Sequence, residues 1–149
     1  MPGAVVLRSD VERKALFGVG ETEKLPEAAY AGEVTARIYA TLTEKARRIL
    51  AARHSVIVDA VFADPRERAA LAAMAKSIPI PLHGLFLTAD LGTRLARIGA
   101  RARDASDADA AVARAQESYD LGRMEWTPID ASGTPAATLA LARTALKGA

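Results

Sequence analysis

The stretch Ser55-Val-Ile-Val-Asp-Ala60 decides how this chain folds. Its centre is a β-branched run that is too short for a helix and apolar on both faces, which is typical of a strand buried in a parallel sheet. The run ends at Asp59, so an acidic side chain is predicted at the carboxyl end of the strand. Parallel strands need crossover connections, and helices are therefore expected on both sides of it.

Helices are predicted immediately before and after this strand. From Pro26 to about Ala52, apolar residues recur at helical spacing, with a proline at the start and basic residues near the end. This segment is predicted to be the longest helix. After the strand, Asp64-Pro-Arg-Glu67 combines a capping acid, a proline at the first helical position and a glutamate at the third. A second helix is therefore expected from there to about Ser77.

The same alternation continues through the rest of the chain. Further strands are predicted at residues 4–8, 83–88 and 126–130. Further helices are expected at residues 90–101, from a polar break at 104–107 to about Asp120, and from Thr134 to about Lys147. We therefore expect a three-layer α/β fold in which the strands form one mostly parallel sheet flanked by helices, within a single domain spanning residues 1–149.

Composition excludes several functional classes. The 149 residues are 50% hydrophobic and 26% charged, which is ordinary for a globular domain. There is no cysteine, which excludes disulfides, thiolate metal sites and a cysteine nucleophile, and which fits the reducing cytoplasm as the expected location. No apolar run approaches the roughly 20 residues of a membrane span. Basic residues cluster at 47–53 and 94–103, and with only 5% aromatic residues these clusters suit phosphate groups better than single-stranded nucleic acid.

Candidate site residues follow from one rule, which is that ligands of open parallel sheets gather at the carboxyl ends of the strands. Asp10 is either a helix-capping acid or a carboxylate that accepts the proton of a substrate hydroxyl. Asp59 is either a turn residue or an acid that binds magnesium, directly or through water. The rule selects the polar residues just after each strand: Ser9, Asp10, Asp59, Thr88, Asp90, Asp130 and Ser132.

A row of arginines is the other candidate. Arg94, Arg97 and Arg101 lie on one face of a predicted helix, where their guanidinium groups either bind phosphate oxygens or form a solvated face. His54 and His83 have neither metal-ligand spacing nor a nucleophile partner. The sequence contains no nucleophile elbow, zinc motif or dinucleotide fingerprint.

Several blocks of sequence together resemble one family. In chain order they are Val6-Leu-Arg-Ser-Asp-Val-Glu-Arg-Lys14, Val56-Ile-Val-Asp-Ala-Val-Phe62 with Arg68 following, His83-Gly-Leu-Phe-Leu87, Asp104-Ala-Ser-Asp-Ala-Asp109 and Ile129-Asp-Ala-Ser-Gly133. This series resembles the AAA-type predicted P-loop kinase family, which is similar to zeta toxins, gluconate kinases and the polynucleotide kinase domain. Members are often fused behind an aminoglycoside-phosphotransferase-like domain. The blocks span nearly the whole chain in the family's order, so they are more specific together than singly.

The resemblance implies both a fold and a chemistry. The fold is that of the P-loop NTPases, and the chemistry uses ATP and magnesium to transfer a phosphoryl group to the hydroxyl of a small molecule. By motif position, Asp10 matches the acid that activates the acceptor, and Asp59 matches the Walker-B-like acid that holds the metal. The resemblance places the remaining site residues in the second half of the chain: Arg101 and Arg103 at the lid, Arg97 beside the nucleotide, and Asp130, Ser132 and Gly133 near the adenine.

The sequence departs from this family at the phosphate-binding loop. It contains no Gly-Lys-Ser or Gly-Lys-Thr, the motif that supplies a lysine and backbone N–H groups to the phosphates, and it lacks the strand and helix around that loop. In the family this strand is central, between the strands that end here at Asp59 and Thr88. Without it we expect a gap in the sheet, a strand edge that needs a pairing partner, or a rearranged sheet. We therefore expect a truncated or mis-started kinase-like domain that transfers no phosphate by itself.

Two other functions stay open at this point. One is a non-catalytic module that binds nucleotide or protein, and the other, less favoured, is a phosphate or nucleic-acid binder that uses the arginine row. The expected partners are a nucleotide and an unidentified small-molecule acceptor, together with a second copy of the chain or an upstream domain. No membrane partner is expected.

Overall fold

The computed structural model describes residues 3–101 and 104–148, and these divide into two compact units. The first unit contains the described residues of 1–79 and 102–107, and the second contains those of 80–101 and 108–149. Each unit has its own pair of strands and its own helices. The expectation of a single domain over the whole chain stays a prediction.

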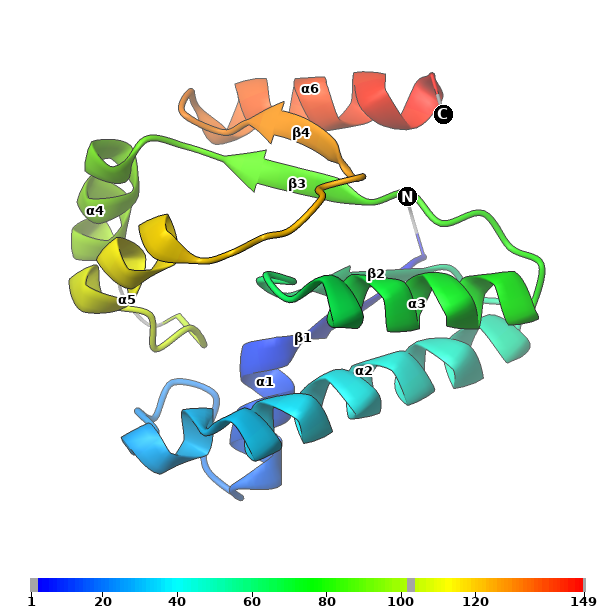
Figure 1. Ribbon diagram of the computed structural model, residues 1–149, viewed down its shortest axis with the longest axis horizontal. Helices are drawn as coiled ribbons and strands as arrows, with labels where there is room; N and C mark the ends of the chain where they lie inside the picture. The colour runs from blue at the N-terminus through cyan, green and yellow to red at the C-terminus, as the bar shows by residue number, and fades with distance from the viewer. Residues whose placement is uncertain (1–2, 102–103, 149) are drawn as a thin grey trace. The chain divides into compact units, whose positions relative to one another are not determined.

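The first unit is built on two parallel strands, β1 (Val5–Arg8) and β2 (Val56–Asp59). They pair in register, so that Arg8, the last residue of β1, lies opposite Asp59, the last residue of β2. The helical segments of this unit, in chain order, are α1 (Ser9–Leu16), the 3-10 turn η1 (Glu27–Tyr30), α2 (Gly32–Ala51) and α3 (Pro65–Ser77) (Figure 1). The parallel pairing confirms the predicted crossover connection.

The apolar face of α2 forms the centre of the core in this unit. Ile38, Leu42 and Ala46, spaced four residues apart, are fully buried, as their helical spacing predicts. Leu7 of β1 and Leu71 of α3 are buried as well. Burying a large aliphatic side chain contributes about 1.5–3 kcal/mol, so this face contributes strongly to the stability of the first unit.

The long helix begins later than the sequence predicts. Instead of one helix from Pro26, the chain forms the separate turn Glu27–Tyr30, and α2 begins at Gly32. The physical reason lies in Ala31, whose extended backbone (φ −55°, ψ 149°) interrupts the helical path. The prediction of the longest helix is confirmed, but its first residues were assigned wrongly.

Helix α3, in contrast, begins and ends where the sequence predicts. The carboxylate of Asp64 accepts a hydrogen bond from the Arg66 N–H at 2.8 Å. Pro65 occupies the first helical position, where its missing N–H removes no helical hydrogen bond. The capping chemistry alone therefore locates this helix.

The second unit is also built on a parallel pair, β3 (Leu85–Thr88) and β4 (Thr127–Asp130), with Thr88 opposite Asp130. Its helical segments are α4 (Leu91–Ala100), α5 (Ala110–Ala115), the 3-10 turn η2 (Gln116–Ser118) and α6 (Pro135–Lys147) (Figure 1). The helix expected to continue to Asp120 is shorter, because the extended backbone of Tyr119 (φ −67°, ψ 131°) ends it.

All strand pairs that the structure describes are parallel, which confirms the α/β fold class with flanking helices. The four strands, however, form two two-stranded sheets instead of the single sheet that we expected. In the described residues β2 pairs with β1 alone and β3 pairs with β4 alone. The family that the sequence resembles places another strand between β2 and β3, and the described residues supply none.

Among the helices of the described residues, none combines the length and the apolar character that crossing a bilayer requires.

Candidate functional site

Asp10 and Asp59 lie at the same end of the first sheet. The register of β1 and β2 places Arg8 opposite Asp59, and Asp10 follows two residues later in the first turn of α1. This confirms the predicted placement of the two acids at one edge. Their roles as base and metal ligand stay predictions.

Asp10 is the more shielded of the two acids. Burial raises the pKa of its carboxyl group, and the nearby charge of Asp59 acts in the same direction. A hydrogen bond with the Ser106 side chain and the charges of Arg8 and Arg13 oppose this change without cancelling it. A carboxylate with a raised pKa is a stronger base than an ordinary surface aspartate, as a group that accepts a hydroxyl proton should be.

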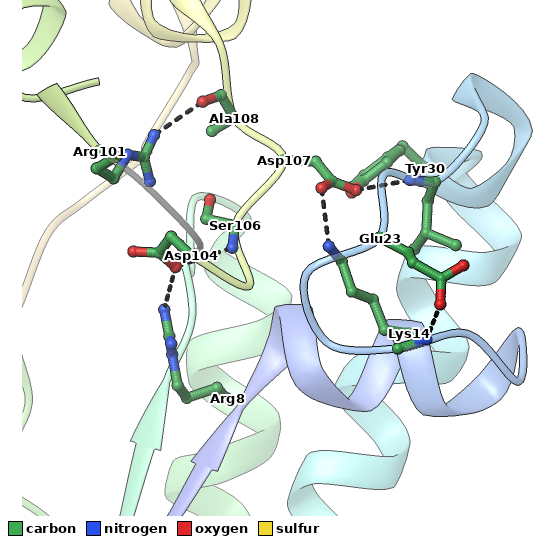
Figure 2. Close-up of polar contacts among 11 residues, drawn as sticks. Arg8, Lys14, Glu23, Tyr30, Arg101, Asp104, Ser106, Asp107 and Ala108 are labelled. Atoms are coloured by element: carbon green, nitrogen blue, oxygen red, sulfur yellow. Dashed lines mark hydrogen bonds and ion pairs between the residues drawn. The ribbon is translucent and has the colours of Figure 1, made fainter. Parts of the chain in front are cut away.

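Arg8 connects the edge of the sheet to a distant segment, which sequence reasoning missed. Its Nε donates to Asp59 Oδ2 at 3.1 Å, and its Nη2 donates to Asp104 Oδ1 at 3.2 Å. The same Asp104 oxygen accepts the Ser106 N–H at 3.0 Å. Figure 2 shows Arg8 pointing toward Asp104, with Ser106 beside it. The rule that selected Ser9 could have selected Arg8 too, because both lie where β1 ends.

The surroundings of Asp59 do not fit the magnesium site that the resemblance implies. Its carboxylate already accepts a hydrogen bond from Arg8. Within residues 3–101 and 104–148, no group of three or more His, Cys, Asp or Glu side chains is placed to bind a metal ion. Asp59 is therefore a single carboxylate with a cationic partner, and these residues do not complete a metal site.

A buried ion pair fixes the segment that carries Asp104 and Ser106. Lys14 Nζ donates to Asp107 Oδ1 at 2.9 Å, and Asp107 Oδ2 accepts the Leu25 N–H at 2.9 Å and the Tyr30 hydroxyl at 2.7 Å. Figure 2 shows Lys14 and Tyr30 converging on Asp107. Burial would raise the pKa of Asp107, but these three donors outweigh it and hold the pKa below its ordinary value. The contact keeps Ser106 beside Asp10.

The cofactor-binding residues predicted in the second unit lie together. Arg97 Nη1 donates to the Ala131 carbonyl at 2.6 Å, and its Nη2 donates to the carbonyls of Ser132 and Gly133. Asp130 Oδ1 accepts the Ser132 N–H at 2.8 Å, and the hydrogen bonds from Ser132 lower the pKa of Asp130. The guanidinium of Arg97 is thus fixed against the turn after β4. The structure brings these residues together, and their role with a nucleotide stays a prediction.

The arginine row is partly exposed, with Arg94 half-buried and Arg97 and Arg101 exposed, and its guanidinium groups are hydrogen-bonded to the backbone. Arg94 Nη2 donates to the Ala113 carbonyl at 2.9 Å, and Arg101 Nη2 donates to the Ala108 carbonyl at 2.8 Å. The predicted lid residue Arg103 lies outside the described residues. A cavity of about 350 Å³ lies beside the row, lined by Arg94, Arg97, Ile98, Arg101, Ala108, Ala113 and Gln116. The row therefore presents fixed cationic groups to this cavity.

Two other sequence candidates have structural roles. Asp90 caps α4, because its carboxylate accepts hydrogen bonds from the Thr93 N–H at 2.9 Å and the Thr93 hydroxyl at 2.6 Å. Thr88 Oγ1 donates to the Ile129 carbonyl at 3.4 Å, across the β3–β4 pair.

A family model described as an AAA domain matches residues 1–120 of this chain. An uncharacterized protein of Mycobacterium tuberculosis is 33% identical over 128 residues, and the alignment covers 80% of this chain and 26% of that protein. A protein of Mycobacterium bovis matches with the same identity and coverage. The chain thus spans about a quarter of the length of these curated relatives.

Two solved structures are similar in fold. A gluconokinase from Sinorhizobium meliloti superposes with a TM-score of 0.56 and 18% sequence identity, covering 98% of this chain and 77% of that chain. The tunicamycin resistance protein of Deinococcus radiodurans gives a TM-score of 0.55 and 19% identity, covering 96% of this chain and 82% of that chain. At these identities the likeness concerns the fold alone.

Proposed function

Because this chain belongs to the AAA domain family and has the fold of P-loop kinase structures, we propose that it is the acceptor-activating part of a small-molecule kinase. The reaction transfers the terminal phosphoryl group of a nucleotide to a hydroxyl group of the acceptor. Asp10 takes the hydroxyl proton while the oxygen–phosphorus bond forms and the bond to the nucleotide breaks. The acceptor class is a hydroxylated metabolite or drug-like molecule.

The placement of Asp10 carries this proposal. It lies at the carboxyl end of a parallel strand, half-buried, where a substrate of an open α/β sheet binds. Its raised pKa favours proton acceptance at neutral pH. Arg13, one turn further along α1, is buried with its Nη1 donating to the Ala29 carbonyl at 2.6 Å, and its positive charge acts on the Asp10 carboxylate.

The second unit carries the residues that we propose to contact a nucleotide. Asp130, Ser132 and Gly133 form a tight turn after β4, and Arg97 is fixed against it. In this proposal the adenine lies along that turn, and Arg101 contacts phosphate oxygens with the guanidinium donors that Ala108 leaves available. Magnesium enters no step, because the residues around Asp59 do not complete a metal site.

A second candidate function is a nucleotide- or protein-binding module without catalysis. The observation that favours it is the sequence itself, which contains no Gly-Lys-Ser or Gly-Lys-Thr for the phosphates. The two candidates differ in one respect. The kinase proposal requires Asp10 to be ionised and reachable, whereas a binding module does not.

Labelled ATP and a panel of hydroxylated acceptors test the kinase proposal. The panel contains sugars, sugar acids, nucleosides and aminoglycosides, and the chain is assayed alone and fused behind a strand, P-loop and helix segment. In the active form, Asp10→Asn should lower kcat by about a hundredfold or more, as expected for loss of a general base. The matched control is Glu21→Gln, which removes the charge of an exposed acid in the same unit and should change nothing. Equal kcat values for Asp10→Asn and wild type would overturn the proposal.

A further inference from the structure

One guanidinium bridges two carboxylates at the edge of the first sheet. Arg8 Nε is 3.1 Å from Asp59 Oδ2, and Arg8 Nη2 is 3.2 Å from Asp104 Oδ1. Asp10 follows Arg8 by two residues in the chain, and the charges of both Arg8 and Asp59 act on its carboxyl group. Arg8 therefore bridges two acids that are brought together from different parts of the chain.

The Arg8 guanidinium joins two carboxylates in the way that a bound divalent cation does. Carboxylates of separate segments that lie close together repel one another unless a cation lies between them. In many sites of this kind the cation is Mg²⁺ or Ca²⁺, which binds carboxylate oxygens directly. Here the rigid fork of an arginine does so, with two of its nitrogens directed to two different acids. Arg13 adds a further positive charge on the Asp10 side.

We propose that the guanidinium of Arg8 takes the place of a divalent cation at Asp59, so that this unit excludes metal from the position where its family resemblance implies one. A cation bound by the Asp59 carboxylate would lie close to the fixed positive charge of Arg8. Repulsion between a dication and a guanidinium about 5 Å apart in water corresponds to roughly a tenfold loss of affinity. The inference concerns cation binding by the free protein, and it holds whether or not the chain is a kinase.

Manganese titration of the purified chain tests this directly. Mn²⁺ broadens the amide NMR signals of residues near its binding site, which gives both a location and an affinity. For wild type, we expect no broadening centred on Asp59 and Asp104. For Arg8→Gln, we expect broadening at these residues, with a Kd at least about tenfold lower than for wild type. Adding Asp59→Asn to Arg8→Gln should remove this binding again.

The matched control is Arg66→Gln, which removes the arginine of another ion pair in the same unit and frees the Asp64 carboxylate. It should leave the response at Asp59 unchanged. Failure of the folded Arg8→Gln variant to gain Mn²⁺ binding would overturn the inference. If that variant does not fold, a comparison of Mn²⁺ binding by wild type and by Asp59→Asn tests the inference instead. Mn²⁺ binding by wild type that Asp59→Asn abolishes would overturn the inference, and equal, unlocalised broadening in both would support it.

Discussion

Lys14 illustrates how much one buried charge matters in this molecule. Only 1% of its side chain is exposed, and its ammonium group binds an Asp107 carboxylate that is 10% exposed. Lys14→Met keeps the apolar part of the side chain but leaves Asp107 without its cation. We predict that the free energy of unfolding falls by about 3 kcal/mol, measured by urea denaturation.

A matched control for Lys14 is available on the surface. Arg47 pairs with Glu44 at 2.7 Å, and 51% of the Arg47 side chain and 54% of the Glu44 side chain are exposed. Because water already solvates both charges, Arg47→Met should leave the free energy of unfolding close to that of wild type. Equal losses for the two variants would show that the Lys14–Asp107 pair is not buried in solution.

The pH dependence of stability should reveal Asp10. Burial raises its pKa in the folded state, so the folded state binds this proton more tightly than the unfolded state does. The contribution of Asp10 to stability therefore falls as the pH rises from the unfolded value, 3.8, through the folded pKa. Asp10→Asn should raise the free energy of unfolding at pH 7 by up to about 1 kcal/mol. This gain should vanish below the unfolded pKa. Urea denaturation at several pH values measures the gain. A gain that persists below the unfolded pKa would contradict the prediction.

The acids of the candidate site could be predicted from the sequence, but their partners could not. Asp10 and Asp59 each follow a recognisable β-branched run, so the end of the sheet on which they lie is a local property. Arg8 and Lys14 bind acids 96 and 93 residues away in the chain. No local pattern reports such a pairing, which arises only when the segment 104–107 packs on the rest of the first unit.

At the scale of elements, the contrast between α3 and α2 shows how a side-chain cap makes the start of a helix predictable. The carboxylate of Asp64 accepts a hydrogen bond at the start of α3, and this boundary was predicted correctly. At the start of α2 no side chain caps the helix, and the interruption at Ala31 depends on backbone angles that the apolar spacing does not encode. Hydrophobic periodicity therefore identified α2 but not its first residue.

The turn between β2 and α3 contains a residue in an unfavourable backbone conformation. Phe62 has a positive φ of 49°, which is unusual for a bulky residue, and its N–H donates to the Tyr39 hydroxyl at 3.0 Å. Arg68, 6% exposed, donates to the carbonyls of Phe62 at 2.6 Å and Ala63 at 2.9 Å. These hydrogen bonds fix the turn that follows Asp59.

We predict that Arg68→Met loosens this turn. Losing hydrogen bonds from a charged donor, at about 1.5–3 kcal/mol, should speed amide exchange of Phe62 by roughly ten- to a hundredfold. Hydrogen–deuterium exchange measures this at the residue concerned. Arg66→Met is the control, because the Arg66 side chain is 91% exposed and binds Asp64 on the surface. Unchanged exchange of Phe62 in Arg68→Met would mean that the hydrogen bonds of Arg68 do not fix the turn.

At the scale of the whole molecule, the family and the parallel α/β fold could be predicted, and the missing motif predicted a gap, an edge to be paired or a rearrangement at the place where the sheet divides. Which of these three outcomes occurs could not be predicted. The order of the motif blocks indicated a P-loop kinase relationship, which the AAA domain match confirms. Strand composition, however, reports burial and not which strands are neighbours. Val6 and Ile57 are 56% and 43% exposed although both lie in strands of an apolar sequence, which reflects a sheet of only two strands.

The lack of a P-loop motif in this sequence determines the affinity for nucleotide that we expect. A P-loop supplies several charge-assisted hydrogen bonds to phosphate, each contributing about 1.5–3 kcal/mol, and the sequence contains no Gly-Lys-Ser or Gly-Lys-Thr to provide them. Losing three such bonds lowers affinity by roughly a thousandfold or more. We therefore predict that this chain binds magnesium-ATP no better than at millimolar Kd and transfers no phosphate. Arg101 does not replace a P-loop, because a flexible side chain loses conformational entropy when it is ordered on a phosphate.

Isothermal titration calorimetry measures the predicted difference between the chain alone and the chain fused behind a strand, P-loop and helix segment. The fused protein should bind magnesium-ATP at micromolar Kd, because preorganised backbone N–H groups then contact the phosphates. The control fusion carries Ala in place of the P-loop lysine and should bind as weakly as the chain alone. Micromolar binding by the unfused chain that Asp59→Ala abolishes would contradict the prediction. That result would also place a cation at Asp59 despite Arg8, because a nucleotide's phosphates contact a carboxylate favourably only through a bound metal ion.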